Sequence, residues 1–217
     1  RRLFHDGAVS LISGGIVRPD IYIDVFGNGH KFPIYGYLGG NLELGKPLAQ
    51  KHVADYRAEM SKPGYLSTAQ RIYEDFYLLL DEMILNDLNE INILVESLDK
   101  RLSKFKIKDS LYKPSGLYYK YPLFGKEMVK AILTKNEQEF SENVFHWSQL
   151  GLNAISTHNS PRTLADIELI LLYDLAIGNG MRPTIDTPFI PKSVIENGYW
   201  NKPEWSAPLS VVTLNSD

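Results

Sequence analysis

The 217-residue sequence contains no cysteine. Without a thiol, the chain can form no disulfide framework, perform no thiol catalysis and hold no cysteine-ligated zinc. A chain of this length can bury about 70% of its unfolded surface, so it needs neither a disulfide nor a metal to fold. An ordinary hydrophobic core is therefore the expected source of stability.

An excess of either charge is also missing, since 26 acidic and 23 basic residues give a net charge of −3. A generic nucleic-acid binder would carry a strongly basic face, so we expect no nucleic-acid partner. Acidic residues interrupt the apolar runs, as in residues 167–173, and none approaches the roughly 20 residues that span a bilayer. These features predict a soluble, cytoplasmic protein without a membrane partner.

The first residues show no apolar core followed by a small-residue cleavage site, so no signal peptide is expected. The chain does not begin with Met, which suggests that some N-terminal sequence is missing.

Recognisable catalytic motifs are lacking as well. No histidine lies in a His-Glu-x-x-His pair or another close ligand spacing; the five are His5, His30, His52, His146 and His158. Glu142 and His146 lie four residues apart and could share a helix face, but no third ligand is suggested. Gly178-Asn179-Gly180 follows a predicted helix rather than a strand, so it is no dinucleotide fingerprint. We predict no catalytic residue, no metal and no cofactor.

Residues 1–46 form a glycine-rich lead-in that holds nine of the 16 glycines. Ile21–Phe26 has the β-branched and aromatic side chains typical of a strand. Gly27-Asn28-Gly29 would supply a turn, and residues 31–35 could return as a second short strand. The alternative is an irregular segment with helical pieces.

Helical patterning begins at Pro47. Ser67 and Gln70 match a capping box, and residues 69–105 contain no glycine or proline. Apolar residues recur there every three or four positions, as in an amphipathic helix; they are Ile72, Phe76, Leu79, Leu80, Met83, Ile84, Leu88, Ile91, Leu94, Val95, Leu98 and Leu102. Asn86-Asp87 favours a break into two helices, because both residues prefer caps to helix interiors.

The C-terminal half continues this pattern after a predicted loop over residues 106–123. Helical spacing returns at residues 124–133, and Asn136 with Glu139 predicts the cap of a further helix. Ser160-Pro161 predicts the start of another helix, which ends at Gly178-Asn179-Gly180. Residues 185–191 read as extended, before a short helix around Ser193–Glu196. The whole sequence predicts one mainly α domain: a multi-helix bundle or array around a long central helix or helix pair, with a small irregular or β element at its N-terminus and a helical body over 47–217.

Acidic residues between Ile72 and Asp99 have no lysine or arginine among them, and Lys100 and Arg101 follow directly. Acids early and bases late suit the helix dipole. A helix built for stability alone would usually interleave lysines four residues on, so the alternative is a surface for a basic partner. The predicted partner-binding residues are Glu74, Asp75, Asp81, Glu82, Asp87 and Glu90.

The C-terminal part carries a family resemblance. Met128–Phe140 resembles a junction between two helices with a small polar break and an acidic cap. An apolar helix over Asp166–Ala176, the turn Gly178-Asn179-Gly180-Met181 and the element Ile185–Pro191 follow it. This order is similar to the immunity protein 49 family of bacterial polymorphic-toxin systems.

The resemblance implies a cytosolic antidote that binds a co-encoded toxin and blocks it, without chemistry of its own. Toxins that act on nucleic acid tend to be basic, so we expect a cognate toxin with a basic surface. Two alternatives stay open. One is a metal-dependent helical hydrolase that uses Glu142 and His146, and the other is a helical scaffold or regulatory module that binds a peptide or small ligand.

Overall fold

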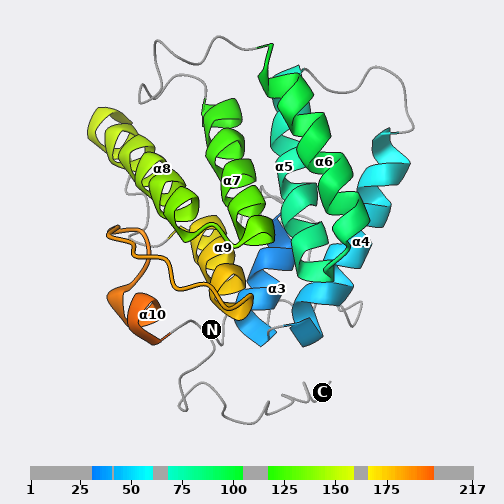
Figure 1. The fold of residues 1–217 in the computed structure, drawn as a ribbon. Coiled ribbons are helices and arrows are strands. Elements are labelled where there is room, and N and C mark those ends of the chain that lie inside the picture. The colour runs from blue at the N-terminus through cyan, green and yellow to red at the C-terminus, as the bar shows by residue number, and fades with distance from the viewer. Residues whose placement is uncertain (1–30, 41, 61–67, 105–116, 159–165, 198–217) are drawn as a thin grey trace, which may run out of the picture.

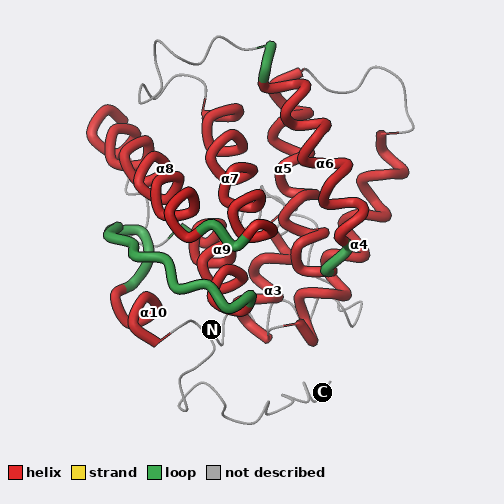
Figure 2. The backbone as a smooth tube through the Cα atoms, viewed as in Figure 1, coloured by secondary structure: helices red, strands yellow, loops and turns green. Residues whose placement is uncertain are grey.

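The computed structural model describes residues 31–40, 42–60, 68–104, 117–158 and 166–197 (Figure 1). These residues form helices joined by turns and loops, with no strand among them (Figure 2). The helices are α3 (Phe32–Gly40), α4 (Leu42–Met60), α5 (Thr68–Leu85), α6 (Leu88–Leu102), α7 (Leu117–Thr134), α8 (Glu137–His158), α9 (Ile167–Gly178) and α10 (Lys192–Asn197). The prediction of a mainly α fold is confirmed.

The break predicted at Asn86-Asp87 is present between α5 and α6. Asn86 turns the chain with a φ of 61°, a left-handed conformation that asparagine tolerates better than most residues. Asp87 then caps α6, because its Oδ1 accepts the backbone N–H groups of Asn89 and Glu90, both at 3.1 Å. Local capping chemistry thus divides the long apolar stripe into two antiparallel neighbours, with α5 packed between α3, α4, α6 and α7.

Two further turns lie where the sequence predicts them. Asn136 begins α8 by accepting the Glu139 backbone N–H at 3.1 Å, and its amide donates to the Glu139 carboxylate. Helix α9 ends at Gly178, and Gly180 follows with a φ of 84°. Residues 181–191 form a loop that turns at Pro188–Phe189 and leads to α10 (Figure 2). The loop meets α8 where the hydroxyls of Ser148 and Thr187 lie 2.6 Å apart.

The second predicted strand, residues 31–35, is wrong, because helix α3 covers most of it. Ile34, Tyr37 and Leu38 are buried at helical spacing, and Pro33 lies in the first turn, where a missing N–H costs little. The strand predicted at Ile21–Phe26 lies outside the described residues. Helical structure therefore starts before Pro47, which itself lies inside α4.

Helix α7 also starts earlier than predicted, since residues 117–123 belong to it and Pro122 lies inside it. The buried side chains of Tyr121 and Phe124 pack into the core there, which offsets the hydrogen bond that a proline cannot make. Helix α9 begins at Ile167 with Asp166 as its cap. The start signal predicted at Ser160-Pro161 lies outside the described residues.

Helix α9 is largely enclosed and lies against α3 and α7. It buries residues on all sides, including the carboxyl groups of Glu168 and Asp174. Tyr37 of α3 donates a hydrogen bond of 2.6 Å to Asp174. No described helix is long and apolar enough to cross a membrane.

Candidate functional site

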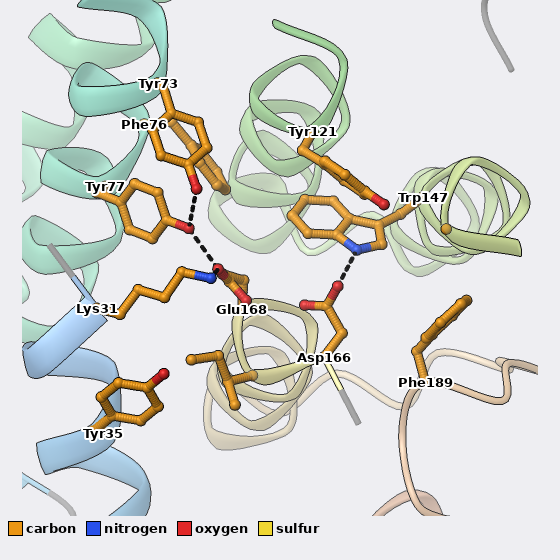
Figure 3. A pocket seen from close by; sticks show the side chains of 12 residues that line it. Lys31, Tyr35, Tyr73, Phe76, Tyr77, Tyr121, Trp147, Asp166, Glu168 and Phe189 are labelled. Carbon is orange, nitrogen blue, oxygen red and sulfur yellow. Dashed lines mark hydrogen bonds and ion pairs between the residues drawn. The ribbon is translucent and has the colours of Figure 1, made fainter. Parts of the chain in front are cut away.

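A cavity of about 270 Å³ lies where α3, α5, α7, α8 and the start of α9 meet (Figure 3). Its wall combines aromatic rings with two carboxyl groups and one ammonium group. The lining residues are Lys31, Tyr35, Tyr73, Phe76, Tyr77, Tyr121, Trp147, Gly151, Asp166, Ile167, Glu168 and Phe189. A concave site with a few convergent polar groups is the usual form of a ligand pocket.

Glu168 lies at the polar end of this cavity. Its Oε1 is 2.6 Å from the Lys31 ammonium and accepts a 2.5 Å hydrogen bond from the Tyr77 hydroxyl, which is itself 3.1 Å from the Tyr73 hydroxyl (Figure 3). Burial alone would raise the pKa of Glu168, but Lys31 and Tyr77 hold it below its ordinary value. Burial would likewise lower the pKa of Lys31, yet Glu168 raises it. Both groups therefore carry their charges at neutral pH.

Asp166 is the second carboxyl group of the cavity. Its Oδ1 caps α9 by accepting the Leu169 backbone N–H at 3.1 Å, and its Oδ2 accepts the Trp147 indole N–H at 2.9 Å. Burial and the nearby charge of Glu168 raise the pKa of Asp166 well above its ordinary range. Two neighbouring buried carboxyl groups do not ionise together easily, so the ionised form of Asp166 is the disfavoured one of the two.

Aromatic rings line the cavity beside Asp166 (Figure 3). The Trp147 ring lies 4.7 Å from Tyr121 and 6.1 Å from Phe76, measured between centroids. Two glycines bring helices close to these rings: a Cβ atom at Gly125 would lie 2.3 Å from Phe76, and one at Gly151 would lie 2.7 Å from Phe189. A side chain at either position would therefore require the neighbouring ring or helix to shift.

The acidic residues predicted from the sequence do not form one exposed, uncompensated face. Asp75, Asp81 and Glu82 are only 5%, 0% and 3% exposed. Their carboxylates pair within the protein: Asp75 with Arg101 at 2.8 Å and with the Tyr56 hydroxyl at 3.1 Å, Asp81 with His52, and Glu82 with Arg57 at 3.5 Å. The premise of missing partners was wrong, because the bases lie on α4 and at the end of α6 rather than among the acids.

The other three predicted acids lie nearer the surface. Glu74 is half-buried, and burial raises its pKa. Glu90 pairs with Arg57 at 3.0 Å, and the exposed Asp87 caps α6. Asp87 and Glu90 thus stay accessible beside the outer face of α6.

The residues of the cavity were not predicted as a site. Among the cavity residues, Glu168 carries a visible signal, because it and Asp174 interrupt a largely apolar helix, and a charged residue in such a position is either buried with a partner or functional. Its partners come from distant positions in the chain, Lys31 and Tyr77. Local sequence patterns do not reveal such a group.

Glu142 and His146 do not come together as metal ligands. The exposed Glu142 accepts a hydrogen bond from Gln138 at 2.9 Å, and the His146 ring stacks on Phe124 with centroids 5.4 Å apart. Across the described residues, no group of three or more His, Cys, Asp or Glu side chains is arranged to hold a metal ion.

Comparison with known proteins finds no match to a family model, a curated protein or a solved structure. The resemblance to the immunity protein 49 family therefore stays a prediction that depends on the quoted sequence elements.

Proposed function

We propose that this protein is an immunity protein that binds a cognate bacterial toxin and blocks it, without catalysis of its own. The order of elements in the C-terminal part supports the resemblance that suggested it. Helices α7 and α8 meet at the Asn136 cap, α9 ends in a glycine turn, and a loop leads to α10. This support concerns the framework, and the binding surface needs a separate argument.

The observation that carries the proposal is the outer face of α6. Leu88 and Ile93 are 57% and 51% exposed there, although side chains of this size are usually buried. Glu96 is three residues from Ile93 and shares its face of α6, while Asp87 directly precedes Leu88 at the start of the helix; both acids are exposed. Apolar side chains bordered by charge are typical of protein interfaces, where the apolar residues supply affinity and the charged rim steers association.

The expected partner has a basic surface around an apolar recess. Asp87 and Glu96 would attract it, and Leu88 and Ile93 would fill the recess. Charge reversal at Asp81 or Glu82 is a poor test of this contact, because each is buried against a base and its substitution would disturb folding first. Substitution of the exposed Leu88 and Ile93 tests the contact without disturbing a buried ion pair.

The experiment combines Leu88→Ala with Ile93→Ala and measures binding to the product of the neighbouring gene, together with protection of cells that express it. We expect affinity to fall roughly tenfold or more, since truncation of a central interface side chain costs about 1 kcal/mol or more. The matched control is Phe145→Ala with Leu152→Ala, which removes two exposed apolar side chains from α8. Equal binding by both double variants would refute the α6 surface, and no complex with the native protein would refute the immunity function.

A second candidate function, a helical module that binds a small ligand, is favoured by the cavity of about 270 Å³ with its convergent carboxyl groups. This function could exist with or without toxin binding.

A further inference from the structure

The cavity contains more acid than base. Two carboxyl groups, Asp166 and Glu168, line it, and Lys31 is the one base among its lining residues within the described part of the chain. Lys31 pairs with Glu168 at 2.6 Å, so the second acid has no cationic counterpart there. Asp166 instead accepts two neutral N–H donors, from Leu169 and Trp147. A buried carboxyl group in this position is neutralised by a proton or by a cation.

The wall beside Asp166 suits a cation with carbon atoms attached. Trp147 donates to Asp166 through its indole nitrogen, and its ring packs near Tyr121 and Phe76 (Figure 3). Phe189 lines the same side. The faces of aromatic rings attract cations, most strongly when both are removed from water.

We propose that this cavity binds a small organic cation, such as a protonated amine, with its charge beside Asp166 and its carbon atoms against Trp147 and Tyr121. The inference rests on the second candidate function, and toxin binding by α6 does not enter it. The volume of about 270 Å³ admits a compact molecule rather than a peptide.

An anionic ligand is the main rival. Lys31 and the N-terminus of α9 both favour negative charge. Glu168 already occupies the Lys31 ammonium, and Asp166 already occupies the Leu169 N–H at the helix start. An incoming carboxylate would have to displace one of these groups and would add a third acid to the cavity, whereas a cation displaces only a proton.

Binding of a cation beside Asp166 should release a proton from this carboxyl group. The other titratable groups that line the cavity with Asp166 are the carboxyl group of Glu168, the ammonium of Lys31 and the hydroxyls of Tyr35, Tyr73, Tyr77 and Tyr121. Burial and Glu168 raise the pKa of Asp166, so a bound cation would expel its proton. Affinity for the cation should therefore rise with pH from about 6 to about 8, because the proton competes less.

The experiment titrates the native protein with benzylammonium and follows the indole N–H resonance of Trp147. We expect a shift of this resonance, tighter binding at the higher pH and proton release in calorimetry with two buffers. Asp166→Asn keeps a side-chain oxygen to cap α9 and should weaken binding roughly tenfold or more. Asp186→Asn makes the same chemical change at an exposed position and should leave binding unchanged.

Neutral benzyl alcohol and anionic benzoate separate the remaining outcomes. Binding of either as tightly as benzylammonium would overturn the cation proposal while keeping the cavity as a ligand site. Equal affinity of native protein and Asp166→Asn would also overturn it. If none of the three compounds binds at millimolar concentration, both the cation proposal and the small-ligand function fail, while toxin binding is unaffected.

Discussion

Gly125 offers the sharpest test of how α5 and α7 pack. A Cβ atom placed on Gly125 would lie 2.3 and 2.4 Å from two ring carbons of Phe76 and 3.1 Å from the ring of Trp147. Both rings are almost fully buried, so neither can turn away into solvent. Gly125→Ala therefore requires a shift of the rings or of the helices themselves.

The expected cost follows from two opposing effects. Overpacking of a buried site costs about 1–3 kcal/mol, while replacing glycine by alanine inside a helix gains about 1 kcal/mol. At distances this far below van der Waals contact we expect the steric cost to dominate, with a net destabilisation of about 1–2 kcal/mol. For a chain of this length, each kcal/mol lowers the melting temperature by about 2–4 °C.

Thermal unfolding of native protein, Gly125→Ala and Gly178→Ala provides the assay. Gly178 is the last residue of α9, and a Cβ atom there would meet nothing within 4 Å. Gly178→Ala should keep or raise the melting temperature, because alanine restricts the unfolded chain by about 0.4–1 kcal/mol. If both variants melt at or above the native temperature, the close packing of Phe76 against α7 is not what limits this position.

Three further outcomes follow from other contacts. Burial raises the pKa of Asp81 to about 7, and Asp81 raises the pKa of His52 despite burial. The folded protein therefore binds more protons than the unfolded chain, so the contribution of Asp81 to stability should be full below about pH 4 and lost as the pH rises through about 7. Asp81→Asn should reduce this pH dependence of the melting temperature. Asp87→Ala should cost about 0.5–2 kcal/mol through loss of the α6 cap, whereas Asp87→Asn should stay near native in the same melts. Tyr37→Phe should lower the urea midpoint by removing the buried hydrogen bond to Asp174, a loss of about 1.5–3 kcal/mol; an unchanged midpoint would contradict the role given to this bond.

The predictable parts of the fold are those that depend on neighbouring residues. The break at Asn86-Asp87 and the cap at Asn136 are local hydrogen-bonding chemistry, which short sequence patterns reveal. The segment that forms α3 was misjudged because a short apolar run fits a strand as well as a buried helix. The start of α7 was missed because Pro122 is usually a loop signal, and only packing with distant residues overrides it.

The pairing of the acids and the make-up of the cavity depend on distant residues, so local sequence patterns could not predict them. Asp81 and Glu82 have no basic residue near them in the sequence. Their basic partners, His52 and Arg57, lie in the preceding helix, α4. The cavity draws its polar groups from residue 31 to residue 168. Sequence periodicity assigns a face to each helix, but it does not say which faces meet.

The two carboxyl groups of α9 also determine how this helix is seated. Seven of its twelve residues are Leu or Ile, and apolar packing alone would tolerate several rotations and slips of such a helix. Glu168 reaches Lys31 just before α3, and Asp174 reaches Tyr37 six residues further along both segments. A rotation or a slip by one turn would leave both acids buried without these partners. The free-energy cost of this would exceed what apolar contacts could regain. Apolar burial thus keeps α9 inside the protein, and the two polar pairs fix its rotation and its position along its axis.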